Sequence, residues 1–371
     1  MKIQIQSRLV SCPFKDIQVN RPLSSMTTLE LGGPAKLLIY LTSIQQALDV
    51  FNWLRTESLP FHVLGGGSNL ICADQGFDGV IVQFKMKEMT FTPLPPTSTQ
   101  KKKGEVYVES GVDWSTCVSN CVDQGWAGIE CLAGIPGHVG AAPIQNIGAY
   151  GASLSDVCTQ VLVYDFIANE LRWWTAEECK WRYRWSHFKA VPNRYIIFAL
   201  KLTLDLASIP PIRYKQLETA LSSVPTQKRT LRTIYESVLE LRRSKSMVWD
   251  PNDPNHRSAG SFFLNPFCTI KEFQDLQERV NAIDPTLSIP HWSEGDRIKV
   301  PAAWLIEHAG CPKGFGQGRV GLSSKHTLAL INRGGATTEE LLLFSALIQE
   351  KVRKKFRIIL EREPNLWQYT L

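Results

Sequence analysis

The sequence has no uninterrupted apolar run of the ~18 residues that a membrane-spanning helix requires, so we expect no membrane partner. It also has no CxxC pair, and its nine cysteines follow no Cys/His spacing typical of metal ligands. We therefore expect reduced core cysteines and no metal site. The beginning of the chain shows neither the apolar stretch nor the small-residue cleavage site of a signal peptide, which predicts a cytoplasmic location.

The composition excludes several classes of protein. The chain is 44% hydrophobic and 20% charged, with a mean hydropathy of −0.12, which is not typical of disordered, collagen-like or coiled-coil sequences. Its 371 residues predict two or three domains. The formal net charge of +6 is a mild bias, and it suits an anionic small molecule as well as it suits nucleic acid.

The segment 35–64 predicts a β-α-β unit. A β-rich run at 37–41 precedes Ser43, which with Gln46 forms a capping box, and apolar residues then recur with helical period. Further helices are expected at 114–124 and 230–243, and Thr337 with Glu340 predicts the start of another. Loop-like sequence at 92–104 and 207–211 marks two boundaries. The pattern predicts an α+β protein.

Two glycine-rich stretches point to a bound ligand. In the GGGSN motif at 65–69, glycine permits close approach of the main chain, and converging N–H groups can hold a diphosphate. The motif lacks the Gly-Lys-Ser/Thr ending of a Walker loop and does not open a helix as a Rossmann fingerprint does. The stretch 134–151 is too apolar for a solvated linker. We expect the two loops to clasp a dinucleotide from both sides; a plain turn and a buried structural loop are the alternatives.

Several segments, in order along the chain, resemble the signature motifs of the UDP-N-acetylenolpyruvoylglucosamine reductases, bacterial flavoenzymes that complete UDP-N-acetylmuramate for peptidoglycan. The matching segments are LGGGSNLI with DQGFDG (64–79), LAGIPGHVGAAPIQNIGAYG (132–151), YRWSHFK (183–189), AGSFFLNP (259–266) and KVPAAWLIEHAG with GRVGLSSKHTLALIN (299–332). The resemblance implies a two-subdomain FAD-binding fold of the vanillyl-alcohol-oxidase type and a C-terminal α+β substrate-binding domain. The expected divisions are 1–90, 91–211 and 212–371.

The family's activity implies non-covalent FAD and NADPH as co-substrate. The residues implied to line the flavin are Gly65, Gly66, Gly67, Ser68, Asn69, Ile135, Pro136, Gly140, Ala141, Gly148 and Tyr150. His138 stands where a small or hydroxyl residue is expected, and covalent attachment of flavin to it is an alternative that we do not favour.

Reduction of an enol ether that carries a carboxylate requires a hydride donor, a group that stabilises an enolate-like anion, and a proton donor. The resemblance implies Ser261 as the acid, Arg184 as the stabiliser and Glu363 as a second group near the anion, with Glu361 as its fallback. Alternation of basic and aromatic residues at 180–185 predicts a strand with Arg184 on its basic face, a pattern that also occurs in proteins that bind single-stranded nucleic acid.

For the sugar nucleotide, the resemblance implies four residues: Tyr214 as a stacking or closing residue, Lys245 for the diphosphate, Asn265, and His308 in place of an expected glutamine. Trp185 and Arg362 also depart from the family pattern. We expect a monomer with no nucleic-acid partner. Another FAD oxidoreductase of the same fold, or a non-catalytic nucleotide-binding protein, are the alternative functions.

Overall fold

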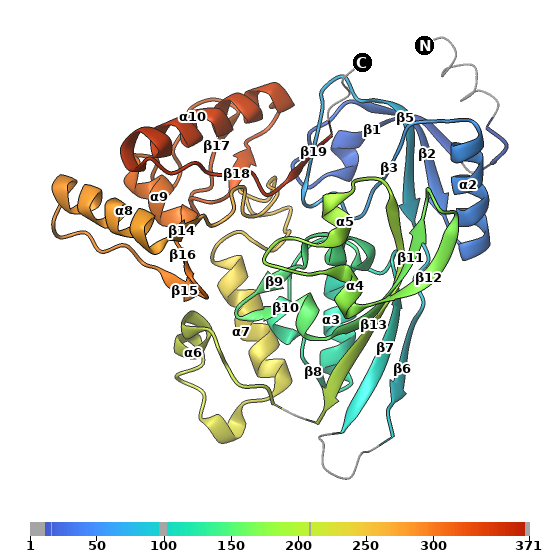
Figure 1. Cartoon of the computed structure of the whole chain (residues 1–371), viewed down its shortest axis with the longest axis horizontal. Coiled ribbons are helices and arrows are strands. Elements are labelled where there is room, and N and C mark those ends of the chain that lie inside the picture. Colours follow the sequence, from blue (N-terminus) through green and yellow to red (C-terminus); the bar gives the residue numbers. More distant parts are fainter. Residues whose placement is uncertain (1–11, 16, 96–101, 208, 368–371) are drawn as a thin grey trace. The chain divides into compact units, whose positions relative to one another are not determined.

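The computed structural model describes residues 12–15, 17–95, 102–207 and 209–367, and the chain divides into two compact units (Figure 1). Unit 1 contains the described residues of Met1–Pro22, Pro34–Gly67 and Phe77–Val248. Unit 2 contains Leu23–Gly33, Ser68–Gly76 and the described part of Trp249–Leu371. The beginning of the chain and the middle of the boundary expected at 92–104 lie largely outside the described residues.

The first sheet of unit 1 contains the predicted β-α-β unit. Its strand order is β1-β2-β5-β3, and β5 runs parallel to both β2 and β3. The helix α2 begins after Ser43, whose side chain accepts a hydrogen bond from the main chain of Gln46 as predicted. The elements are β1 (Ile17–Pro22), β2 (Pro34–Leu41), α2 (Ile44–Thr56), β3 (Phe61–Val63) and β5 (Phe77–Phe84).

The second sheet of unit 1 is buried on both faces. In β11, Val161 and Val163 pack with the helices α3 (Trp114–Asp123) and α7 (Leu231–Arg243), whereas Leu162 and Tyr164 pack with residues of the first sheet and α2. This alternation explains why four successive residues, 161–164, are all buried. The main strands are β12 (Glu170–Thr175), β11 (Cys158–Asp165), β13 (Tyr195–Leu206), β7 (Lys103–Glu109) and β6 (Met89–Pro93), in that order, with β8 (Trp126–Ala127) beside β13.

Short elements and two longer helices complete unit 1. They are α3 (Trp114–Asp123), η2 (Glu130–Leu132), η3 (Val139–Gln145), β9 (Gly148–Ala149), β10 (Ala152–Ser153), η4 (Leu154–Asp156), α4 (Ala176–Cys179), α5 (His187–Ala190), α6 (Lys215–Ala220), η5 (Thr226–Lys228) and α7 (Leu231–Arg243). The boundary expected at residue 211 does not coincide with the division observed at Val248, because Ile234 and Val238 of α7 pack in the core of unit 1.

Unit 2 packs its helices around the apolar face of α10, where Leu341, Ile348 and Val352 are fully buried. Thr337 and Glu340 form the predicted capping box at its start. The elements are η1 (Leu23–Met26), β4 (Leu70–Cys72), β14 (Phe267–Thr269), α8 (Ile270–Ile283), β15 (Trp292–Glu294), β16 (Arg297–Lys299), α9 (Ala302–His308), β17 (Val320–Leu322), β18 (Leu330–Asn332), α10 (Thr338–Phe356) and β19 (Asn365–Trp367).

All nine cysteines are free, and eight of them are buried, as predicted. Among the described residues, no helix combines the length and the apolar character needed to cross a bilayer.

Candidate active site

The first glycine loop follows β3 at the edge of the sheet where the parallel strands β3 and β5 end. The side chain of Gln83, near the end of β5, donates a hydrogen bond of 2.8 Å to the carbonyl oxygen of Gly65 and fixes the loop. Within the described residues, the N–H groups of Gly65, Gly66 and Gly67 donate no hydrogen bond. Three adjacent main-chain donors are therefore available to an anion such as a diphosphate.

The second glycine loop lies directly against the first. A Cβ atom added to Gly66 would lie 2.6 Å from Cα of Gly137, and one added to Gly65 would lie 3.0 Å from Cβ of Ala141. The stretch is not a regular helix, as predicted, but it contains the 3₁₀ helix η3 and the short hairpin β9–β10. The two loops are therefore in close main-chain contact at Gly66 and Gly137.

His138 belongs to this contact, since its main-chain nitrogen lies 3.3 Å from the Cβ position of Gly66. Burial, assisted by the positive charge of Lys85, lowers the pKa of its imidazole below the ordinary value. At neutral pH the ring is therefore uncharged, beside the loop that we expect to hold the cofactor.

Arg184 lies in a tight turn and not in a strand, so the prediction of a strand at 180–185 is wrong. Lys180 and Arg184 both adopt left-handed backbone conformations, with φ of 49° and 50°, which end any extended run. The carbonyl of Arg182 accepts the N–H of Trp185 in the turn. This turn directs Nη2 of Arg184 to the carbonyl oxygen of Gly148, at 2.8 Å, in the second glycine loop.

Tyr150, two residues after the Gly148 carbonyl that Arg184 binds, contacts two of the residues implied in substrate binding. Its ring makes an edge-on contact with Tyr214, with centroids 5.4 Å apart, and Nζ of Lys245 lies 5.8 Å from the ring centroid. Lys245 also donates a hydrogen bond of 2.7 Å to Gln216. Although we assigned Tyr150 to the flavin alone, in unit 1 it contacts the residues predicted to hold the sugar nucleotide.

Arg242 is a residue that we did not select from the sequence. It lies at the end of α7 and interacts electrostatically with Tyr150 and with Arg184. The sequence carried a signal, because Ile234, Val238 and Arg242 recur at intervals of four residues. An arginine that continues a buried apolar stripe of a helix is unusual unless it has a polar task.

In unit 2, the structure brings Ser261 and Glu363 onto neighbouring segments. The N–H of Glu363 donates a hydrogen bond of 3.0 Å to the carbonyl of Phe262, and Phe263 and Arg362 form an antiparallel bridge. The hydroxyl of Ser261 makes no hydrogen bond with any described residue, so it is available as a donor. Glu363 is 8% exposed, whereas Glu361 is exposed, which favours Glu363 of the two glutamates.

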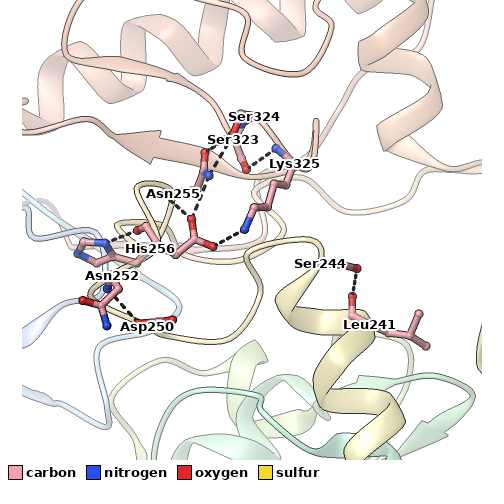
Figure 2. Close-up of polar contacts among 10 residues, drawn as sticks. Leu241, Ser244, Asp250, Asn252, Asn255, His256, Ser323, Ser324 and Lys325 are labelled. Carbon is pink, nitrogen blue, oxygen red and sulfur yellow. Dashed lines mark hydrogen bonds and ion pairs between the residues drawn. The ribbon is translucent and has the colours of Figure 1, made fainter.

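The segment that carries Ser261 is held by a polar network (Figure 2). Oδ1 of Asn255 accepts the N–H of Ser324 at 2.9 Å, and Nζ of Lys325 lies 3.0 Å from Oδ2 of Asp253. The loop that contains Ser324 and Lys325 then continues to Leu328, whose carbonyl accepts the N–H of Phe262 at 2.8 Å. The network therefore links residues 253–255 to the residue next to Ser261.

Asn265 and His308 lie at opposite ends of α9. Oδ1 of Asn265 accepts the N–H of Ala302 at 2.9 Å, at the beginning of the helix. The ring of His308 stacks on Trp304 with centroids 4.1 Å apart, and Nδ1 lies 2.8 Å from the carbonyl oxygen of Trp304. These contacts give both side chains a part in the local structure, and a ligand role for either stays a prediction.

The residues present fit FAD. The first loop ends a β-α-β unit and offers unused main-chain N–H donors to a diphosphate, and at Gly66 a side chain would clash with the second loop. Residues 35–170 match the family model described as "FAD binding domain". Residues 252–367 match the model described as "UDP-N-acetylenolpyruvoylglucosamine reductase, C-terminal domain". The chain is thus a flavoprotein with an FAD-binding unit and a reductase-type C-terminal domain, and the predicted fold class is confirmed.

Similar curated proteins extend the match over the whole chain. The UDP-N-acetylenolpyruvoylglucosamine reductase of Thermobifida fusca is 43% identical over 355 residues, which cover 95% of this chain and 98% of that protein. The reductase of Streptomyces coelicolor is 39% identical over 98% of this chain and 92% of its own length. The chain belongs to the family of UDP-N-acetylenolpyruvoylglucosamine reductases.

A solved structure agrees with this fold. The crystal structure of the UDP-N-acetylenolpyruvylglucosamine reductase from Thermus caldophilus aligns with a TM-score of 0.61 at 22% identity, over 95% of this chain and all of that one.

Proposed function

We propose that this chain catalyses the NADPH-dependent reduction of UDP-N-acetylglucosamine enolpyruvate to UDP-N-acetylmuramate, with FAD as its bound cofactor. The observation that carries the proposal is the identity of 43% to a curated reductase over 95% of the chain. Bound FAD supplies the hydride transfer. The residues that would hold it are those of the glycine loop 65–69 and, in the second loop, Ile135, Pro136, Gly140, Ala141, Gly148 and Tyr150.

Ser261 is the proposed proton donor. A serine hydroxyl is a weak acid, but an enolate-like carbon is basic enough to take its proton when the geometry is fixed. Gly260, with φ of 69°, precedes Ser261 in a left-handed conformation, and Phe262 and Phe263, which follow it, are fully buried. The half-buried hydroxyl is thereby held near apolar walls without a competing partner among the described residues.

Arg184 and Glu363 are the proposed stabilising groups. A guanidinium is always charged and can bind a carboxylate with two parallel hydrogen bonds, which suits the carboxylate of the enolpyruvyl group. The buried carboxyl of Glu363, on the segment beside Phe262, is proposed to interact with the developing enolate. Tyr214, Lys245, Asn265 and His308 are the proposed contacts to the sugar nucleotide.

An anaerobic two-stage assay tests the proposal. NADPH should bleach the flavin absorbance of the purified holoenzyme, and UDP-N-acetylglucosamine enolpyruvate should then restore it. In Ser261→Ala the first stage should proceed at nearly the wild-type rate, whereas the second should be severely slowed. If the wild-type flavin is bleached by NADPH and the enolpyruvyl sugar does not restore it, another substrate is indicated; equal loss of both stages in Ser261→Ala would remove its role as the acid.

The proposal includes a cytoplasmic location and a monomeric enzyme. The substrates are small nucleotides, and the absence of a membrane-spanning helix from the described residues is compatible with this location. Gel filtration of the holoenzyme with light scattering measures the mass: a value near 41.8 kDa supports the monomer, and a multiple of it rejects it.

A further inference from the structure

The guanidinium of Arg242 is held inside unit 1 with most of its hydrogen-bonding capacity unused. Nη2 donates a hydrogen bond of 2.7 Å to the carbonyl of Met247, whereas Nε is buried and has no partner among the described residues. A Cβ atom added to Gly134 would lie 3.4 Å from this Nε. The group therefore lies against the beginning of the second glycine loop.

The charges around Arg242 are of its own sign. Burial lowers the pKa of Arg242 to about 10, and the nearby Arg184 contributes to this lowering, while Tyr150 opposes it. Lys245 adds a third cation at the ring of Tyr150. Within the described part of the chain, Arg242 forms no ion pair with an acidic residue.

A buried charge without a counter-ion is unfavourable by several kcal/mol, and proteins rarely retain one without a task. Support of the turn at Met247 does not need a guanidinium, since that contact uses one of its five N–H donors. The guanidinium groups of Arg242 and Arg184, with the ammonium of Lys245 at the ring of Tyr150, instead match an oxyanion, which would compensate the charge of Arg242 and occupy its unused donors.

We propose that Arg242 is a further substrate-binding residue, which binds an oxyanion of the nucleotide sugar together with Arg184 and Lys245. The inference rests on the proposed function and adds one residue to it. The oxyanion chemistry has two sources in this substrate, the diphosphate and the carboxylate of the enolpyruvyl group. UDP-N-acetylglucosamine carries only the first, so it separates them.

The experiment compares Arg242→Gln and Arg242→Lys with Arg243→Gln, which removes the same charge from the neighbouring, exposed position of α7. Binding of UDP-N-acetylglucosamine to the oxidised holoenzyme is followed by flavin absorbance, and KM and kcat are measured with the enolpyruvyl substrate. A hydrogen bond to a charged group is worth about 1.5–3 kcal/mol, so Arg242→Gln should weaken binding or raise KM roughly 10- to 150-fold. Arg242→Lys should recover part of the loss, and Arg243→Gln should bind as wild type.

Weakened binding of UDP-N-acetylglucosamine assigns Arg242 to the diphosphate, and a raised KM with normal binding of this ligand assigns it to the carboxylate. A second measurement, the melting temperature of the ligand-free holoenzyme, separates binding from architecture. Removal of an uncompensated charge should leave that temperature unchanged or raise it in Arg242→Gln.

Wild-type binding and KM in Arg242→Gln would overturn the inference, and so would a lowered melting temperature with loss of FAD and equal slowing of both half-reactions. The proposed function fails in a different way. In that case, the wild-type enzyme itself does not pass electrons to the enolpyruvyl substrate, whatever residue stands at position 242.

Discussion

Gly66→Ala should damage the cofactor loop more than a methyl group ordinarily does. The new Cβ would lie 2.6 Å from Cα and 3.1 Å from the carbonyl carbon of Gly137, and both are main-chain atoms that no side-chain rotation can move. One of the two glycine loops therefore has to shift. Overpacking of this kind costs typically 1–3 kcal/mol, and a cost of this size on the FAD-bound state corresponds to a loss of roughly 5- to 150-fold in FAD affinity.

The matched control is Gly65→Ala, one residue earlier in the same loop. Its Cβ would lie 3.0 Å from Cβ of Ala141 and nothing else lies within 4 Å, so a shift of a few tenths of an ångström relieves the contact. We expect a smaller effect. FAD content after dialysis and titration of the apoprotein with FAD, followed by quenching of flavin fluorescence, measure both variants. Retention of wild-type FAD affinity by Gly66→Ala would refute the reasoning that these loops form one tightly packed cofactor platform.

Three other predictions test the remaining groups. Glu363→Gln should slow reoxidation of the reduced enzyme by the enolpyruvyl substrate, and Glu361→Gln, at an exposed position, should not; the reverse order in stopped-flow traces would contradict the choice. Asn255→Ala, which removes the acceptor of the Ser324 N–H, should slow the same step with little effect on NADPH oxidation. Equal slowing of both steps would contradict this prediction. The hydrogen bonds from Arg194 lower the pKa of Asp165, so their contribution to stability is present above the ordinary pKa of ~3.9 and is lost as pH falls through the lowered pKa. The free energy of unfolding of Asp165→Asn should therefore depend less on pH in this acid range, and an unchanged dependence would contradict the stabilising role of the pair.

Local signals in the sequence predicted several elements of the fold and the first glycine loop. The capping residues Ser43 and Thr337 begin helices where expected, because the first turn of a helix needs side-chain acceptors wherever it occurs. The glycine loop after β3 was predicted from its run of three glycines, which lets the main chain approach a ligand closely. These features depend on neighbours within a few residues.

The turn at Arg184 was missed because an alternating pattern of side chains does not show whether a partner strand is present. Basic and aromatic residues alternate through 180–185, but a strand also needs a neighbouring strand to take its hydrogen bonds, and β12 ends before this segment. Left-handed conformations at Lys180 and Arg184 have no signal in their residue types. No local signal predicts the partner of β4 either, because β4 pairs with β19, which comes from the far end of the chain.

The GGGSN motif also shows why its glycines alone could not decide between a cofactor loop and a plain turn. The chain passes from unit 1 to unit 2 within this motif, after Gly67, whose φ of 65° is in the left-handed region. Glycine at position 67 is thus explained by the turn that the chain makes there, with or without a ligand. Gly66 is different, because its requirement comes from the approach of Gly137, a residue of the second loop. The packing of one loop on the other, which no local pattern contains, explains this glycine, and the cofactor interpretation rests on the unused main-chain donors of the loop together with the match to an FAD-binding domain.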